Sequence, residues 1–477
     1  SSSKVIEFCY IYHGQILVIG GGTAGCTMAA KFTNKFKNAK DRVIVVEPSE
    51  THYYQPMFTL IGGGVKPFES CHEKMEKVLP KSAKWVKDKV TKFDPKSNTV
   101  IVGNGDSIEY EYLIVATGLQ LHWDKIPGLK EALKDDKVPV CSIYGPDTVE
   151  KVFKIIKNTK SGTAYFTFPS SPVKCPGAPQ KIAYLAEDYW RNKQKLRDIR
   201  VTYNTALPVI FGVKKYADAL WKICEKRKID VNLQTNLIKI IPSKNEAVFE
   251  NLKNPNESRT VTFAMLHVTP PMGPPDVLKS HPELTNEAGF LTVDPQTLRH
   301  VKYPNIFGLG DCTDTPNSKT MAAIASQSKV VFGNITSDLD GKQAKETYDG
   351  YASCPLVTGY GKCILAEFNY KLEPTETFPM NQANEYFIMY LMKKDFFPYL
   401  YWNWMLKLVQ KRVCSTRHMK CYFVTHFHIH LFSEAAGTAL QFFENTSTCF
   451  RIKITSRRQQ PRRRELRCVK EKMYRRC

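Results

Sequence analysis

Two cysteines stand in loop-like sequence where a thiol could react. Cys175 lies in PSSPVKCPGAPQ, next to Lys174 and shortly before an expected helix, and Cys354 lies in YASCPLVTGYGKC. A neighbouring cation and a helix N-terminus lower the pKa of a thiol and favour the reactive thiolate. We interpret the two Cys-Pro loops as a candidate redox pair. Cys312 is the main competitor, and an inert loop cysteine is the alternative for Cys175.

A glycine motif predicts a second kind of chemistry. Gly20, Gly22 and Gly25 form GxGxxG between an expected strand and an expected helix, and Glu47 ends the following strand. Such glycines permit a tight turn, the approach of a pyrophosphate and close helix packing, while the acid accepts hydrogen bonds from a ribose. The arrangement predicts a dinucleotide site.

The sequence GLGD favours FAD as the dinucleotide. It ends an expected strand with Gly310 and Asp311. An acid at this place can bond the ribityl chain of a flavin, which NAD lacks. An aspartate that only caps the following helix is the alternative reading.

Prolines disrupt the second phosphate loop that an NAD(P)H enzyme would need. After the expected strand TAYFTF, the turn holds a single glycine, Gly177, among Pro169, Pro172, Pro176 and Pro179. Proline lacks a backbone N–H and blocks the close approach of a pyrophosphate. We therefore expect this site to be unusable for a nicotinamide cofactor.

These motifs require an α/β scaffold with two similar halves. The expected strands cover 15–20, 41–47, 83–93, 99–102, 111–116, 163–168, 199–203, 247–250 and 261–269, and the expected helices cover 146–156, 178–190 and 213–226. A strand ending at Asp311 and a helix over 319–331 then rejoin the first sheet.

The composition is that of a large globular chain. Its 477 residues, 43% hydrophobic and 24% charged, exclude a small disulfide scaffold and a largely disordered body. The chain contains no run of 18 apolar residues, so the sequence predicts no membrane-spanning helix. The first dozen residues resemble neither a signal peptide nor an Arg-rich targeting helix, so we expect any targeting segment to lie upstream or to be missing.

The formal net charge of +22 is unevenly distributed, because more than half of it lies in residues 411–477. The moderate excess in the body argues against a protein dedicated to nucleic acid. The tail lacks periodicity and is expected to be disordered. Its His426, His428 and His430 alternate near Cys421, but without a second ligand cluster we expect no metal site.

The stretch DFFPYLYWNWML, from Asp395 to Leu406, concentrates aromatic residues. Amphipathic aromatic side chains favour a membrane interface or contact with a quinone, but they also fill ordinary cores. Both interpretations stay open at this point.

The chain from about Gln15 to Leu406 closely resembles the mitochondrial sulfide:quinone oxidoreductases, a family of flavoprotein disulfide reductases. The resemblance rests on VIGGGTAG, VEPSETHYYQP, FTFPSSPVKCPGAPQKI, IFGVKKYADAL, LHVTPPMGPPDVL, YPNIFGLGDCT, SKTMAAIASQS, YDGYASCPLVTGY and YLMKKDFFPYLYWN. The implied fold is α/β, with two Rossmann-like dinucleotide-binding domains, the FAD domain being split in sequence, plus a small C-terminal region.

The resemblance also implies site residues. Cys175 and Cys354 match the two catalytic cysteines, which are linked through sulfur in the resting enzyme. Lys181 and Lys393 match basic residues near them. Positions around FAD are matched by Gly20, Gly21, Gly22, Gly25, Glu47, Gln55, Val90, Gly310 and Asp311. Val90 is expected to act through its backbone near the adenine.

The implied enzyme oxidises hydrogen sulfide through the cysteine bridge and FAD. It passes two electrons to ubiquinone and the sulfane sulfur to a small acceptor such as glutathione or sulfite. The implied location is the mitochondrial inner membrane, with monotopic or peripheral attachment. A type II NADH:quinone dehydrogenase is one alternative, against which the prolines argue, and a nucleic-acid binder acting through the basic tail is another.

The implied domains follow the same resemblance. An FAD-binding domain covers 15–140 and 271–345, a second Rossmann-like domain covers 141–270, and a quinone- and membrane-side region covers 346–406. Residues 1–14 form an atypical lead and residues 407–477 form the basic tail, and both depart from the family pattern.

Overall fold

The first sheet is built around the strand that precedes the glycine motif. The computed structural model describes residues 10–36 and 39–407, so the histidines and cysteines of the basic tail lie outside the described residues. The strand order is β5 (Lys84–Val86), β2 (Val43–Val46), β1 (Ile11–Ile19), β8 (Ser107–Val115), β7 (Thr99–Val102) and β6 (Val90–Asp94), and β19 (Ile306–Gly308) also pairs with β8. The central strand β1 is fully buried from Ile16 to Val18, as expected of a parallel strand covered on both faces.

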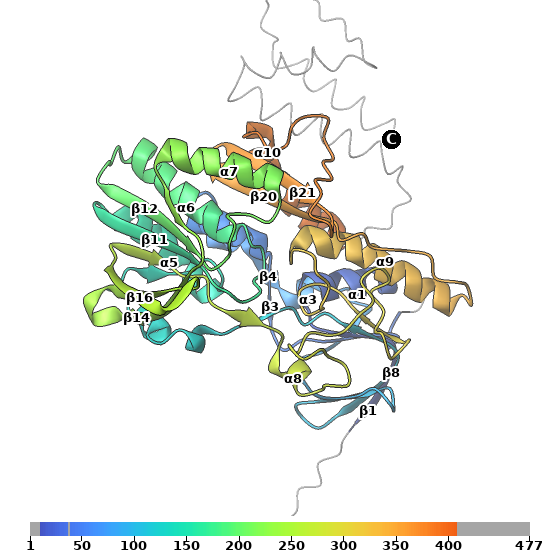
Figure 1. Ribbon diagram of the computed structural model, residues 1–477. Coiled ribbons are helices and arrows are strands. Elements are labelled where there is room, and N and C mark those ends of the chain that lie inside the picture. Colours follow the sequence, from blue (N-terminus) through green and yellow to red (C-terminus); the bar gives the residue numbers. More distant parts are fainter. Residues whose placement is uncertain (1–9, 37–38, 408–477) are drawn as a thin grey trace, which may run out of the picture. The chain divides into compact units, whose positions relative to one another are not determined.

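Two helices far apart in the sequence pack together on this sheet. Helix α1 (Thr23–Lys35) follows the glycine motif, and α9 (Met321–Leu339) returns from the late part of the chain to lie against α1 (Figure 1). Strand β19 joins the same sheet beside β8. The prediction that the chain after residue 300 rejoins the first sheet is therefore confirmed.

The second sheet is fully parallel and carries its helices as the alternating sequence pattern predicts. Its order is β10 (Val140–Cys141), β17 (Met265–His267), β11 (Gly162–Phe168), β12 (Ile199–Thr205) and β13 (Asp230–Asn232). The crossover helices are α5 (Pro146–Asn158), α6 (Ala178–Asp188) and α7 (Lys214–Arg227). A separate antiparallel sheet follows with β14 (Thr235–Ile241), β15 (Glu246–Asn251) and β16 (Asn254–Thr262).

Shorter elements complete these two halves. They are β3 (Thr51–Tyr53), α2 (Phe58–Gly62), β4 (His72–Lys74), α3 (Met75–Val78), β9 (Gln120–Leu121), α4 (Leu129–Lys134), β18 (Met272–Gly273) and α8 (Asp276–Lys279). The predicted fold class, two Rossmann-like halves with the first one split in sequence, is confirmed by this topology.

Three predicted strands were wrong in extent. The expected strand over 83–93 is two strands, because the chain turns at Lys87–Lys89 and β5 and β6 lie at opposite edges of the first sheet. The strand expected over 261–269 is split between β16 and β17. The strand expected to end at Asp311 stops at Gly308, because Gly310 adopts a left-handed φ of 80° and turns the chain.

A hairpin of β20 (Ala352–Gly359) and β21 (Lys362–Phe368) contributes to two hydrophobic cores. Cys354, Leu356 and Ile364 belong to the core of the second half, whereas Val357 and Cys363 belong to the core of the first half. Side chains that alternate along a strand point to opposite faces, which explains this division. The expectation that Cys354 lies in a loop was wrong, since it pairs with Ala366 inside the hairpin.

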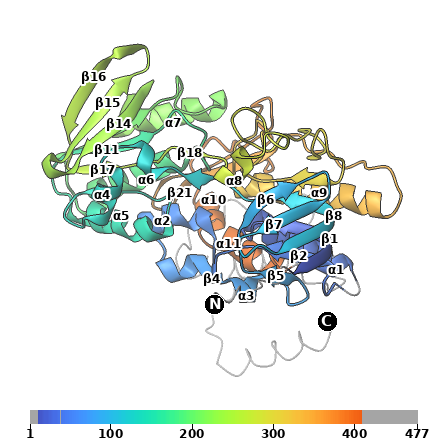
Figure 2. The ribbon, with the colours of Figure 1, turned by 90° about the horizontal axis from the view of Figure 1, so that it is seen from below.

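The chain then forms a helical segment, here called the C-terminal segment, from Phe387 to Met405. It contains α10 (Phe387–Leu391) and α11 (Phe397–Leu400), each followed by a π-helical turn. Figure 2 shows α11 beside the first sheet, and Met389, Tyr401 and Leu406 belong to the core of that half. Within the aromatic stretch, Tyr401 is therefore buried, and Phe396, Phe397 and Trp402 pack partly buried against the same core.

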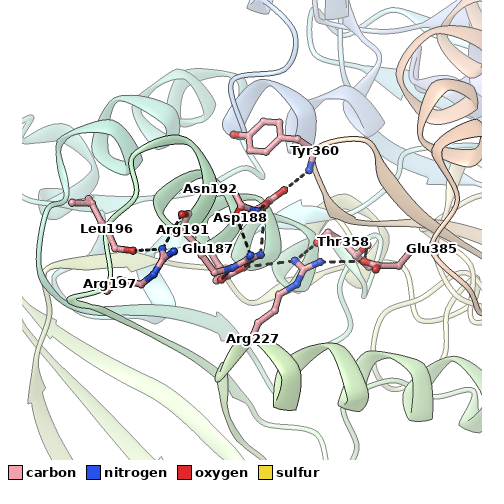
Figure 3. Close-up of polar contacts among 10 residues, drawn as sticks. All are labelled: Glu187, Asp188, Arg191, Asn192, Leu196, Arg197, Arg227, Thr358, Tyr360 and Glu385. Atoms are coloured by element: carbon pink, nitrogen blue, oxygen red, sulfur yellow. Dashed lines mark hydrogen bonds and ion pairs between the residues drawn. The ribbon is translucent and has the colours of Figure 1, made fainter. Parts of the chain in front are cut away.

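A buried polar cluster fixes the hairpin to the ends of α6 and α7 (Figure 3). The Arg227 guanidinium, with only 6% of its side chain exposed, donates to the carbonyl of Thr358 and pairs with Glu385 at 3.1 Å. The Tyr360 backbone N–H donates to Asp188 at 2.7 Å. Because Glu187 and Asp188 end α6, these contacts fix the tip of the hairpin relative to that helix.

Removing the central cation should destabilise the protein. We expect Arg227→Met to cost about 3 kcal/mol in the free energy of unfolding, because Glu385 loses its cation and the Thr358 carbonyl loses its donor, whereas Glu187 keeps Arg191. The matched control is Arg200→Met, which removes an exposed pair with Asp230 and should cost at most about 1 kcal/mol. Equal urea midpoints for the two variants would contradict this assignment.

Candidate active site

Cys175 sits in a strained turn directly before α6. Its φ of 51° lies in the left-handed region, which favours glycine, so the turn is held by hydrogen bonds. The Cys175 N–H donates to the carbonyl of Lys319 at 2.8 Å, and the Cys175 carbonyl accepts from the N–H of Ala178 at 2.9 Å. The prediction of a loop cysteine before a helix is confirmed.

Gly177 allows the hairpin to approach this turn. A Cβ at Gly177 would lie 2.5 Å from Leu356 Cδ2 and 2.8 Å from Cys354 Sγ, far closer than real Cβ contacts. The only glycine among the prolines thus has a packing role that the sequence did not reveal. Strand β20 can reach the N-terminus of α6 because no side chain stands between them.

The two predicted cysteines meet at this contact. The Sγ atoms of Cys175 and Cys354 lie 3.8 Å apart, and Lys181 Nζ lies 3.2 Å from the first and 3.6 Å from the second. Lys181 and Cys354 are each 2% exposed. Cys312, the competing cysteine, is fully buried elsewhere, with its Sγ against the carbonyls of Val115 and Leu309.

The surroundings shift the pKa values of the two thiols in opposite directions. The hydrogen bond from Cys354 lowers the pKa of Cys175 well below its usual range, and the charges of Lys181 and Lys393 act in the same direction. The same shared proton raises the pKa of Cys354. Burial opposes the charge of Lys181, but the two sulfurs outweigh it and raise the pKa of that ammonium. In the reduced pair, Cys175 therefore carries negative charge more readily than Cys354 does.

Two further lysines border the pair. Lys393 Nζ donates to the carbonyl of Pro56 at 2.8 Å, and burial together with the charge of Lys181 lowers its pKa to about 8. Lys174 Nζ donates to Gln55 Oε1 at 2.7 Å, and burial lowers its pKa also to about 8. Gln55, expected near the flavin, is thereby linked to the cysteine loop.

The glycine loop has the features of a dinucleotide cradle. A Cβ at Gly25 would lie 1.7 Å from the carbonyl of Gly20, which explains the close packing of helix and strand. At Gly22 and Gly118 a Cβ would meet nothing within 4 Å, so the backbone borders open space. Among the described residues, no side chain caps α1. These residues fit a bound pyrophosphate at the helix N-terminus.

Of the remaining predicted cofactor positions, Glu47 contacts the glycine loop and Gly310 lies beside Ala24 of α1. The Glu47 carboxylate accepts from the N–H of Gly21 at 2.5 Å, and the N–H of Gly310 donates to Gln327. Burial raises the pKa of Asp311, whereas the positive charges of Lys319 and Lys174 act to lower it. Val90 begins β6 with a buried side chain. Their roles toward FAD stay predictions.

Sequence reasoning missed several residues that shape the site. Besides Gly177, the backbone carbonyl of Lys319 holds the Cys175 turn, and the Tyr144 hydroxyl lies 3.5 Å from the Cys175 carbonyl. Lys319 belongs to the segment SKTMAAIASQS, but a contact made by its backbone carbonyl does not depend on the residue type and so cannot be predicted from the sequence. Tyr144 follows a short buried strand, which gives the same signal as an ordinary core residue.

Comparisons with known proteins agree with this geometry. Residues 14–152 match the family described as pyridine nucleotide-disulphide oxidoreductase. The chain is 48% identical to the mitochondrial sulfide:quinone oxidoreductase of Mus musculus, covering 83% of this chain and 87% of that protein. For the Dictyostelium discoideum protein of the same name, the identity is 45%, with 82% and 86% covered.

A solved structure shares the fold. The sulfide:quinone oxidoreductase of Aquifex aeolicus matches with a TM-score of 0.72 at 20% identity, covering 87% of this chain and 95% of that chain. The two Rossmann-like halves and the family match together define a flavin-dependent oxidoreductase of the disulphide oxidoreductase class. Within that class, the chain belongs to the mitochondrial sulfide:quinone oxidoreductase family.

Filling the space at Gly177 should separate the thiols. We expect Gly177→Ala to slow formation of a Cys175–Cys354 bridge by up to about 100-fold under a mild oxidant, because the new methyl group displaces Cys354. Thiol titration against time measures this. The control is Gly212→Ala, where a Cβ has its nearest contact at 4.0 Å. Unchanged bridge formation in Gly177→Ala would refute the close approach.

The lysine between the sulfurs should control thiolate formation. The pKa of the Cys175 thiol is lowered. Reduced Cys175 should therefore stay reactive toward iodoacetamide as the pH falls below the usual thiol pKa, and it should lose reactivity only near its own pKa. We expect Lys181→Met to move that midpoint upward by at least about one pH unit. Lys31→Met, on α1 beside the Phe332 ring, is the control. Overlapping profiles of Lys181→Met and wild type would be inconsistent with this role.

Proposed function

We propose that this protein oxidises hydrogen sulfide at the Cys175–Cys354 pair and passes two electrons through FAD to ubiquinone. The observation that carries the proposal is the ammonium of Lys181 within 3.6 Å of both sulfurs. The family's named activity supports the same donor and acceptor. The sulfane sulfur goes to a small acceptor such as glutathione or sulfite.

The asymmetry of the two thiols supports one direction of attack. Hydrosulfide attacks the bridge on the side of Cys354, the S–S bond to Cys175 breaks, and Cys354 keeps the new sulfur as a persulfide. The electron pair stays on Cys175, whose lowered pKa makes it the better leaving group. Lys181 stabilises this developing negative charge in a buried environment.

The cycle closes at the same pair. A nucleophilic acceptor takes the outer sulfur and leaves Cys354 as a thiolate. Two electrons leave the thiol pair when the bridge forms again, and FAD, when bound, supplies the chemistry that accepts such a pair and delivers it to a quinone. Gly20, Gly21, Gly22, Gly25, Glu47, Gln55, Val90, Gly310 and Asp311 would hold the flavin.

The second half supports sulfide rather than NADH as the donor. The N–H of Ala178, at the start of α6, already bonds the carbonyl of Cys175, and Pro179 beside it has no N–H. A pyrophosphate would find few donors there. This observation disfavours the type II NADH:quinone dehydrogenase alternative.

Location and domain limits are part of the proposal. The named relatives are mitochondrial, and we place this protein at the inner membrane. In the described part of the chain, no helix is both long and apolar enough to cross a bilayer. The C-terminal segment exposes Phe387 by 47% and Trp404 by 43%, which supports contact with a membrane surface. We keep 15–140 with 271–345, 141–270 and 346–406 as the functional domains.

Anaerobic spectroscopy tests donor and cofactor together. Sulfide should bleach the flavin absorbance of the purified protein, whereas NADH should not. We expect Cys175→Ser and Cys354→Ser each to abolish sulfide-dependent quinone reduction while flavin content is unchanged. Cys312→Ser is the control and should turn over normally, because the Cys312 Sγ contacts the carbonyls of Val115 and Leu309 rather than either sulfur of the pair. Rapid bleaching by NADH alone, or near-normal turnover of either serine variant, would overturn the proposal.

A further inference from the structure

The C-terminal segment contacts the glycine loop through one buried tyrosine. Tyr401 is 1% exposed, and its hydroxyl lies 2.6 Å from His52 Nε2 and 2.9 Å from Thr23 Oγ1. Its ring packs against Tyr54 with centroids 4.5 Å apart. Thr23 is the first residue of α1, directly after Gly22. A residue near the end of the described chain therefore reaches the loop near its beginning.

The chemistry of the partners fixes the direction of each hydrogen bond. His52 Nδ1 lies 2.9 Å from the carbonyl of Gly21, which can only accept, so this nitrogen carries the proton. Burial lowers the pKa of His52 to about 4, so the ring is neutral and Nε2 is an acceptor. The Tyr401 hydroxyl must then donate to Nε2, and the Thr23 hydroxyl donates to the Tyr401 oxygen.

This chain of donors holds the loop on both sides of Gly22. The carbonyl of Gly21 accepts from His52, and the Thr23 side chain is tied to Tyr401. The N–H of Gly21 is held separately by Glu47. Gly22 itself borders open space, whereas Gly21 packs against Glu47 and Met75. The loop thus keeps its shape through contacts made beneath it.

We propose that Tyr401 is a positioning residue for the flavin, and that packing of the C-terminal segment shapes the glycine loop for the pyrophosphate. The inference rests on the proposed use of FAD. It makes the segment that exposes Phe387 and Trp404 a structural part of the cofactor site. Disturbing this segment should therefore loosen FAD before it unfolds the protein.

The test is FAD retention by the purified full-length protein with Tyr401→Phe, which keeps the ring and removes only the hydroxyl. We expect FAD to bind about 10-fold more weakly, equivalent to ~1.4 kcal/mol, because His52 Nε2 loses its buried donor. Flavin fluorescence on titration of the apoprotein measures affinity. When Tyr401→Phe is heated, flavin should be released before the tryptophan fluorescence reports unfolding. Adding excess FAD to this variant should restore the flavin-bound protein.

Two further variants keep the test decisive. Tyr216→Phe removes a fully buried hydroxyl in the core of the second half and should bind FAD like the wild type. Thr23→Val keeps the Tyr401–His52 bond and should weaken FAD binding less than Tyr401→Phe does. Wild-type affinity in Tyr401→Phe, or an equal loss in Tyr216→Phe, would overturn the inference. A wild type without flavin would instead overturn the cofactor assignment, and this inference with it.

Discussion

The buried ammonium of Lys181 is the charge on which the arrangement of the site depends. A cation removed from water is costly unless it is paired, and Lys181 finds its partners in two sulfurs at 3.2 and 3.6 Å. Helix α6 supplies the lysine, the turn before it supplies Cys175, and strand β20 supplies Cys354. The pairing works only if these three segments keep a fixed distance, so the surrounding structure serves to hold them.

The hairpin keeps this fixed distance because contacts hold both of its faces, its start and its tip. One of its faces packs with the second half and the other with the first. Near its start, Gly177 leaves room for Cys354, and at its tip Arg227 and Asp188 bind its backbone. A strand fixed at both ends and buried on both faces cannot slide relative to α6. The reactive geometry is thereby a property of the whole body rather than of one loop.

Most of the fold and part of the site could be predicted from local sequence patterns. Buried strand runs, the spacing of Gly20 to Gly25 and the Cys-Pro strings identified both halves and both cysteines from neighbouring residues alone. Reasoning failed where distant segments decide the outcome. Cys354 was expected in a loop because Pro355 follows it, yet pairing with β21 makes it part of a strand. Neither the space at Gly177 nor the contact of Tyr401 with His52 has a signature at short range, because each partner lies far away in the sequence.

The distribution of the remaining thiols has a consequence for chemical self-damage. Of the eight cysteines in the described part of the chain, only Cys175 is not buried. Burial raises the pKa of Cys71 and Cys363 to about 12 and that of Cys224 to about 11. Reactive sulfur species modify accessible thiolates, and these bystander cysteines offer none. Within the described part of the chain, the cysteines outside the candidate pair are thus protected from the sulfur species that the proposed reaction would form.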